Sequence, residues 1–388
     1  MFTPRHTGTA ALAASALLLT GCSGGSGDDP AQAGDGADIT DPVVTTYDGG
    51  ILVLDGSTLE VEADIELDGF NRLNPAGDGR HLLVSTSAGF EVLDAVAGEL
   101  TGTVFEAGTP GHVVVHEGRT VLFDDGSGDI TVFDSDEAGE IEPEEAETHS
   151  SGEPHHGVAV ELSSGELVHT VGDEDEVSGV AVLDPEGNEV DRTDDCPGVH
   201  GETVAQDETV VVGCEDGAVL YDGDGFAKVD SEDDYGRIGN QAGSEHSPVV
   251  LGDYKVDEDA ELERPERVAL IDSAAEELEL VDLPASYTFR SLGRGPEGEA
   301  LVLGTDGTLH VIDPEEGEVV DGVELMDEWE EPLEWQQPRP ALFVRGSTAY
   351  VSDPDADELH AVDLESLEVT ATQGLEGEPN ELSGVSAP

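Results

Sequence analysis

Three short motifs repeat a histidine at the start of an apolar run. They read PGHVVV (110–115), PHHGVAV (154–160) and PGVHGETV (197–204). In each, a turn residue precedes a β-branched stretch, which is typical of the start of a strand. Histidine accounts for only 12 of the 388 residues, so its recurrence at this position, as His112, His156 and His200, indicates a shared role. Three imidazoles around one point are a common way to bind zinc, with a carboxylate or water as the fourth ligand.

The second motif holds two adjacent histidines, His155 and His156. Neighbouring side chains on a strand point to opposite faces. We expect His156 to face the same point as His112 and His200. His155 then faces the other way and either joins the metal or braces the site, so both remain candidate ligands. Protons compete for neutral imidazoles near a pKa of about 6.5, so the affinity for metal should fall around that pH.

Acidic residues close to the first motif could complete such a site. The segment LFDDGSG carries Asp124 and Asp125 at the end of the next apolar run. Either could be the fourth ligand, or could orient an imidazole by a hydrogen bond. His116 and His246 are further candidates, for which a surface or packing role is the alternative.

The elements that must position these residues follow a period. A unit made of an apolar strand, a tight turn and a second strand that ends in Asp recurs about every 40–50 residues. This is the range expected for four-stranded propeller blades. Helix-period patterns are nearly absent. The sequence therefore predicts an all-β chain forming a single β-propeller, with a tandem of sandwiches as the alternative. Eight blades are expected, or seven because one unit is irregular, at 43–65, 70–105, 110–145, 154–195, 197–232, 238–285, 288–325 and 337–374.

The ends of the repeat predict how the ring closes. The first unit lacks an innermost strand, and EPNELSGV (378–385) resembles the start of a blade with no blade after it. Pairing the two would close the ring and leave no exposed sheet edge. In a propeller, the first strand of each blade lines the central channel. The three histidines, which begin consecutive units, should therefore converge there.

The N-terminus is typical of an exported protein. Basic residues precede a short apolar run that ends in LTGC, which predicts a lipoprotein signal peptide over 1–21 with lipidation of Cys22. An ordinary signal peptide is the alternative. A Gly/Ser-rich acidic tether over 22–42 then leads to the propeller over 43–388. We expect a secreted protein that is lipid-anchored at the outer face of the cell membrane, with no other contact with lipid.

Charge and cysteine content narrow the partners and the chemistry. Ninety acidic residues against 14 basic ones give a formal net charge of −76, which excludes nucleic acid as a partner. We interpret this acidity as a solvated surface, and we expect a monomer. Besides Cys22, only Cys196 and Cys214 remain. An even pair in an oxidising compartment favours a disulfide, and zinc ligation is the alternative.

The motifs PHHGVAV, CPGVHGE, VVGCEDG and GHVVVHEGRTVLFDDGSG resemble those of the AztD zinc metallochaperones. These are exported propellers associated with bacterial zinc-importing ABC transporters. The resemblance covers much of 70–250 and implies that zinc is bound in the propeller and delivered to the solute-binding protein of such a transporter. It makes candidate ligands of the motif residues His112, Asp125, His155, His156 and His200, and Cys196 and Cys214 match the motif cysteines. The tether here carries no histidine, so it should hold no metal.

Two other functions fit a propeller. A lactonase-like hydrolase or lyase would use a channel metal to activate water, and an interaction scaffold would use the histidines only as satisfied channel residues. The sequence contains no nucleophile elbow and no carboxylate pair in an obvious general-acid setting. We therefore predict a metal carrier and not an enzyme.

Overall fold

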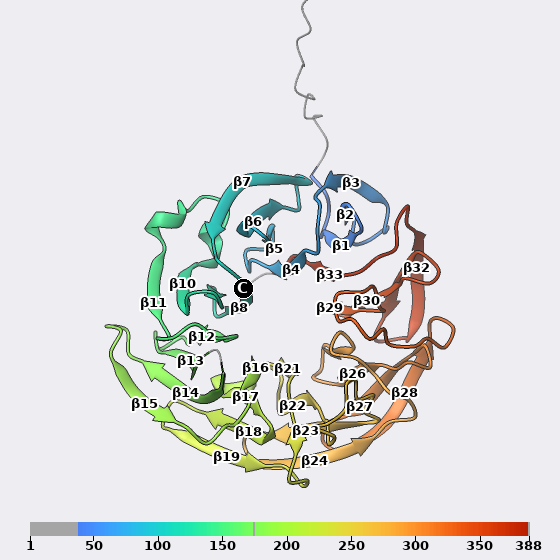
Figure 1. Ribbon diagram of the computed structural model, residues 1–388. Coiled ribbons are helices and arrows are strands. Elements are labelled where there is room, and N and C mark those ends of the chain that lie inside the picture. The colour runs from blue at the N-terminus through green and yellow to red at the C-terminus, as the bar shows by residue number, and fades with distance from the viewer. Residues whose placement is uncertain (1–37, 174, 387–388) are drawn as a thin grey trace, which may run out of the picture. The chain divides into compact units, whose positions relative to one another are not determined.

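Eight antiparallel sheets surround a central channel in the computed structural model, which describes residues 38–173 and 175–386 (Figure 1). The predicted signal peptide (1–21), Cys22 and most of the predicted tether lie outside these residues. The prediction of an all-β propeller is confirmed, with eight blades and not seven. No helix in the described residues is long and apolar enough to cross a bilayer.

Each blade has four strands, and its first strand lines the channel except in the first blade. The first blade contains β1 (Val43–Tyr47), β2 (Gly50–Leu54), β3 (Val61–Glu66) and β33 (Leu382–Gly384). The second contains β4 (Arg72–Pro75), β5 (His81–Thr86), β6 (Gly89–Asp94) and β7 (Glu99–Glu106). The third contains β8 (Pro110–His116), β9 (Arg119–Asp124), β10 (Asp129–Asp134) and β11 (Glu147–Ser150). The fourth contains β12 (Ala159–Glu161), β13 (Leu167–Gly172), β14 (Val177–Leu183) and β15 (Glu189–Thr193).

The second half of the ring repeats this plan. The fifth blade contains β16 (His200–Val204), β17 (Val210–Cys214), β18 (Asp216–Tyr221) and β19 (Phe226–Asp230), with a short extra strand β20 (Gly236–Arg237) beside β18. The sixth contains β21 (Gln241–Ser244), β22 (Ser247–Asp253), β23 (Arg267–Asp272) and β24 (Glu277–Asp282). The seventh contains β25 (Leu292–Arg294), β26 (Ala300–Leu303), β27 (Thr308–Asp313) and β28 (Glu318–Glu324), and the eighth β29 (Leu342–Arg345), β30 (Thr348–Asp353), β31 (Glu358–Asp363) and β32 (Glu368–Gly374). Three 3-10 turns lie between strands, at Ser135–Glu137, Pro143–Glu145 and Gln206–Glu208.

The recurring Asp at strand ends starts the tight turns. Asp272, for example, accepts hydrogen bonds from the backbone N–H groups of Ala274 and Ala275, both at 2.9 Å. Asp313 makes the same pair of contacts with Glu315 and Glu316. An Asp side chain that binds its own backbone two and three residues on favours a turn over continued pairing. The repeated strands that end in Asp in the sequence therefore mark the positions of the hairpin turns.

The C-terminal strand closes the ring as predicted. β33 pairs antiparallel with β1, with Val44 opposite Ser383. The Thr45 hydroxyl donates to the Glu381 carbonyl at 2.8 Å, and Val385 is 4% exposed. Because β33 supplies the inner strand of the first blade, β1 is not left as an unpaired edge.

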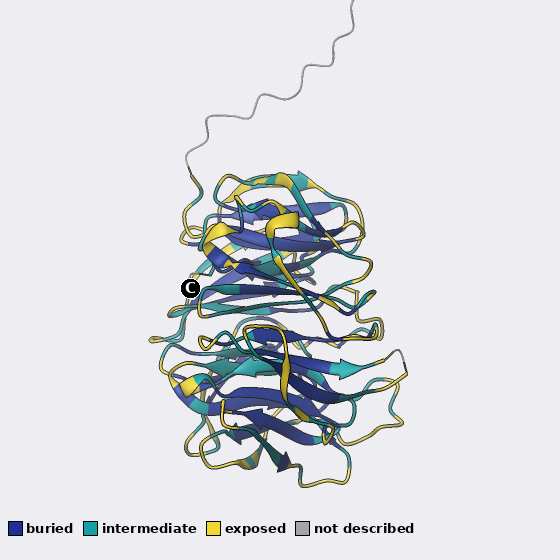
Figure 2. Cartoon of the chain, turned by 90° about the vertical axis from the view of Figure 1, so that its left-hand side faces the viewer, coloured by how far each residue is buried: buried dark blue, intermediate teal, exposed yellow. Residues whose placement is uncertain are grey.

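Apolar side chains fill the spaces between neighbouring blades. Valine and leucine from the two middle strands of each blade are buried, whereas the outer strands are largely exposed (Figure 2). Residues 38–42 belong to the predicted tether but contact the propeller. The Ile39 N–H donates to the Val96 carbonyl at 2.8 Å, and the Ile39 side chain packs beside the core of the first two blades.

Candidate metal centre

His112 is carried on β8, the inner strand of the third blade. The pairing of β8 with β9 shifts register between Pro110 and Val113, so His112 lies in a bulge. A bulge re-aims the side chain that it carries. The preceding residue must be glycine, because a Cβ at Gly111 would lie 2.2 Å from an Asp125 carboxylate oxygen. The residue before His112 therefore lies directly against the Asp125 carboxylate.

His200 begins β16 in the fifth blade and also lies beside a bulge. The register between β16 and β17 shifts between His200 and Glu202, across Gly201 with its φ of +69°. Only glycine adopts that conformation without strain. The Nδ1–H of His200 donates to the Gly239 carbonyl at 2.5 Å, which leaves the Nε2 lone pair free for a metal.

His156 precedes β12 in the fourth blade, on an irregular segment. Its Nδ1 lies 2.5 Å from Asp125 Oδ2, and the Gly157 N–H donates to the other oxygen of Asp125 at 3.3 Å. A carboxylate that accepts Nδ1–H fixes the tautomer and makes Nε2 a better metal ligand. Asp125 therefore orients His156, the second of the two roles predicted for it.

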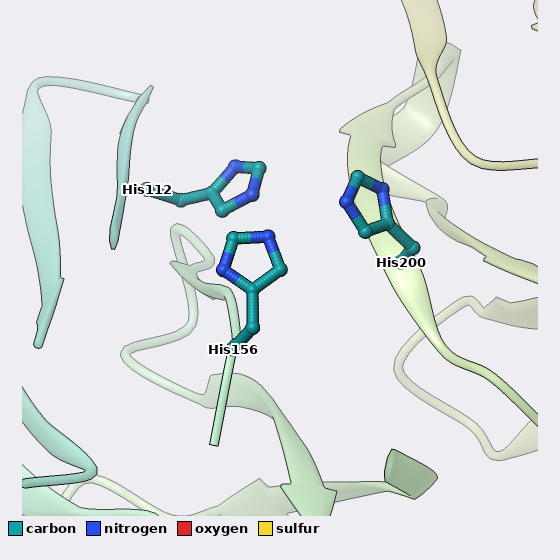
Figure 3. Close-up of side chains that lie close together, drawn as sticks. All are labelled: His112, His156 and His200. Carbon is teal, nitrogen blue, oxygen red and sulfur yellow. The ribbon is translucent and has the colours of Figure 1, made fainter. Parts of the chain in front are cut away.

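The three rings converge on one point at the channel (Figure 3). One ligand atom from each of His112, His156 and His200 can be chosen so that all three lie within 4.8 Å of one another. Ring centroids are separated by 5.1 Å for His112–His156, 5.1 Å for His156–His200 and 5.9 Å for His112–His200. Among residues 38–173 and 175–386, no carboxylate or thiol joins the group. It thus offers three nitrogen ligands and one position for water or an incoming ligand.

Burial keeps two of these rings neutral. Burial lowers the pKa of His200 to about 4, with Arg237 and His156 adding to the effect and the Gly239 carbonyl opposing it. Burial also lowers the pKa of His112 well below its usual value, assisted by repulsion from the protonated forms of His156 and His200 and by the charge of Arg72. A neutral imidazole is the form that binds metal. The His156 side chain, by contrast, is 47% exposed.

His155 is not part of the cluster, so its candidacy as a ligand is corrected. It is 3% exposed and packs edge-on against Phe123, with ring centroids 5.2 Å apart. Its Nδ1 donates to the Glu153 carbonyl at 2.9 Å, and its Nε2 lies 3.0 Å from the Thr170 hydroxyl. Both ring nitrogens are occupied, so His155 braces the loop that presents His156.

The remaining candidate ligands also lie elsewhere. Asp124 holds a turn, accepting from Gly108 N at 3.0 Å, Thr109 N at 2.8 Å and Gly126 N at 3.0 Å. His116, at the far end of β8, lies 2.8 Å from a Glu208 carboxylate oxygen. His246 is in the exposed turn between β21 and β22.

Cys196 and Cys214 form a disulfide, which confirms the favoured pairing and leaves neither thiolate for zinc. Both residues are fully buried. Cys196 precedes β16 and Cys214 ends β17, so the bond ties the segment that leads into His200 to the neighbouring strand. The disulfide therefore fixes the start of the strand that carries His200 without contributing a ligand.

Two contributors to the site could not be found from the sequence. The carbonyl of Gly239 orients His200 from the segment before β21, and a backbone carbonyl leaves no mark on residue type. Arg72, at the start of β4, lies close enough to lower the pKa of His112. The sequence offers only one indication of this role, namely that Arg72 lies at the start of an inner strand, as the histidines do in their own blades.

The chain is similar in sequence to a known zinc chaperone. No protein-family profile matches the chain. The zinc chaperone AztD of Citrobacter koseri is 27% identical over 300 residues, which are 72% of this chain and 65%, or just under two thirds, of that protein.

Solved structures give the same result for the fold. The structure of apo AztD from Citrobacter koseri has a TM-score of 0.75 at 22% identity, covering 89% of this chain and 96% of that chain. A second crystal structure of Citrobacter koseri AztD has a TM-score of 0.74 with the same identity, covering 89% and 98%. The dihydro-heme d1 dehydrogenase NirN shares the fold more distantly, with a TM-score of 0.60 and 13% identity over 91% of this chain and 77% of that chain. The resemblance expected from the motifs is confirmed, and the chain is similar to the zinc chaperone AztD in both sequence and fold.

Proposed function

We propose that this protein is a zinc metallochaperone that holds one zinc ion between His112, His156 and His200. The observation that carries the proposal is the convergence of these three rings from three consecutive blades, with their ligand atoms within 4.8 Å. The similarity to a protein named as a zinc chaperone supports it independently. Nitrogen ligands in this number suit zinc, and the hydrogen bonds of His156 and His200 leave Nε2 available on each ring.

The site is suited to carrying zinc and not to holding it permanently. Structural zinc sites are closed by four protein ligands, whereas here the fourth position is left to water or to a ligand from a partner. His156 is nearly half exposed and lies on a loop, so a recipient protein can reach the metal from that side. The Asp125 carboxylate is engaged by His156, which leaves it poorly placed to act as a general base.

The delivery route is part of the proposal. We infer that the recipient is the solute-binding protein of a zinc ABC importer, and that the chaperone acts as a monomer outside the cell. A lipid on Cys22 would hold it at the outer face of the membrane, with the preceding signal peptide removed. The motif resemblance and the N-terminal sequence support these steps.

Metal analysis of purified variants tests the zinc site. We expect the wild type to bind one zinc per chain, and His112→Ala or His200→Ala to lose tight binding while keeping a cooperative thermal transition. His246→Ala is the matched control, because its ring is exposed and outside the cluster. His155→Ala should lower the melting temperature but retain stoichiometric zinc. Stoichiometric zinc in the double variant His112→Ala/His200→Ala would contradict the site.

A further inference from the structure

A long loop joins the seventh and eighth blades on the face where the histidines lie. It spans 325–341, between β28 and β29, and we call it the mouth loop. Its neighbours are the segments that lead into two inner strands, β4 and β33. Trp335 packs edge-on against Phe70, just before β4, with ring centroids 5.1 Å apart. The Asn380 side chain, just before β33, donates to the Gln336 carbonyl at 2.9 Å. The loop therefore reaches from its own blades to the first and second.

Two buried side chains hold the mouth loop in one conformation. Trp329 is 9% exposed, and its indole N–H donates to the Gly304 carbonyl at 3.0 Å. Arg339 is 2% exposed and binds the Glu331 carboxylate at 2.8 Å and the Glu334 carbonyl at 2.8 Å. A buried, fully paired arginine of this kind fixes the backbone that it binds. The segment between these anchors is therefore presented rigidly.

That segment exposes two large apolar side chains. Leu333 is 68% exposed and Trp335 is 52% exposed. The other large hydrophobic residues exposed in the described part of the chain are all valines, and all but one lie on the outermost strands of blades: Val61, Val190, Val256, Val319, Val320 and Val369. Exposed tryptophan on a rigid support is the residue most enriched at the energetic centres of protein interfaces.

The mouth loop is connected to the metal centre by a short chain of contacts. Asn380, which binds the loop, is next to Glu381, and Glu381 pairs with Arg72 at 3.8 Å. Arg72 begins β4, and β4 packs beside β8, the inner strand that carries His112. A protein that docks on the loop would thus lie at the same channel opening as the three histidines.

We propose that Leu333 and Trp335 of the mouth loop are the docking site for the protein that receives zinc, an inference that rests on the function proposed above. Exposed carboxylates surround the pair, at Asp327, Glu328, Glu330 and Glu334. The matching surface on the recipient is an apolar patch bordered by lysine or arginine. Charge pairs at such a rim govern the rate of association and its salt dependence, whereas the apolar centre sets the lifetime of the complex.

The same carboxylates argue against a membrane as the occupant. Exposed tryptophan and leucine also insert into lipid interfaces, but anchors of that kind carry lysine and arginine around them. Here the surrounding charge is negative, and anionic lipid would be repelled.

The test uses the full propeller loaded with zinc and the purified apo solute-binding protein of the zinc importer from the same organism. We expect Leu333→Ser/Trp335→Ala to weaken the complex at least tenfold and to slow zinc transfer correspondingly. Zinc affinity should be unchanged, because neither residue is in the cluster. Val190→Ser/Val320→Ser is the matched control, since both valines are 54% exposed, and it should behave as the wild type.

A second variant keeps the inference testable should the first fold poorly. Glu328→Lys/Glu334→Lys changes only exposed side chains, and it should slow association and flatten its dependence on salt. If the Leu333→Ser/Trp335→Ala and Glu328→Lys/Glu334→Lys variants form the complex as well as the wild type does, the docking site is overturned and the zinc site is left intact. If zinc-loaded wild type forms no complex with the solute-binding protein, the delivery step of the proposed function fails, and the docking site fails with it. Trp335-dependent binding to anionic phospholipid vesicles would also overturn the inference, in favour of a membrane.

Discussion

Zinc binding should resist acid far better than three ordinary imidazoles would allow. Between pH 7.5 and pH 5.5, an imidazole with a pKa of about 6.5 loses about tenfold of its neutral form, so three together would raise the apparent Kd by about 1,000-fold. The structure lowers the pKa of His200 to about 4 and that of His112 well below its usual value. His200 therefore stays neutral over this range and removes about tenfold of that increase, and the lowered pKa of His112 reduces it further. This revises the expectation from sequence that affinity falls steeply near 6.5.

The assay is a competition titration with a chromophoric zinc chelator at a series of pH values, corrected for protonation of the chelator. We expect log Kd to rise by less than about two units in total between pH 7.5 and pH 5.5, because the buried ring of His200 takes up no proton there and burial also opposes protonation of His112. Circular dichroism at each pH verifies that the fold persists. A total rise near three units would refute the reasoning, since it would show that His112 and His200 titrate as exposed imidazoles do.

Three further predictions concern Asp125, the stability of the apo protein and the ring closure. Asp125→Ala should weaken zinc binding by about 10–100-fold by freeing His156, whereas Asp124→Ala, which removes a turn contact, should lower the melting temperature and leave zinc affinity as it was. The apo protein should lose stability as pH falls below about 6.5, because His112 and His200 are protonated in the unfolded state there, whereas burial in the folded state opposes their protonation. A pKa of about 4 for His200 makes its share about 2 kcal/mol at pH 5. Urea titrations at pH 7.5 and at pH 5 measure this loss of unfolding free energy. The prediction would be contradicted if the His200→Ala variant lost as much stability as the wild type between these two pH values. Removing residues 378–388 should expose β1 and cause aggregation or loss of the cooperative transition; a truncated protein that melts like the full chain would show that β33 is dispensable.

Much of the fold could be predicted because its signals are local. Each hairpin has an Asp that turns the chain and apolar residues that fill the space beside the next blade, so the period is visible in one sequence. Ring closure could be predicted because 378–385 has the pattern of an inner strand without a blade to follow. The end of the tether could not: Ile39 packs on the propeller through one apolar side chain, which composition does not separate from a linker.

The metal centre could be predicted only in part. The repeated position of the histidines identified His112, His156 and His200, but strand alternation was the wrong basis for separating His155 from His156. Both precede β12, which begins at Ala159, and their roles are decided by contacts with Thr170 and Asp125. Asp124 and Asp125 are identical neighbours, and only the path of the backbone shows which of them reaches a histidine.

The geometry of the apo cluster bears on how zinc is released. Four ligands around zinc, with bonds of about 2.0–2.1 Å, place neighbouring nitrogens about 3.3 Å apart, and the three ligand atoms here lie within 4.8 Å of one another. His200 is held by Gly239 and His112 by its bulged strand. Any movement of a ligand during zinc binding or release therefore falls mainly to His156, the exposed ring on a loop. The same ring is the one that a recipient protein reaches first, so the ligand that closes the site on zinc is also the one best placed to open it.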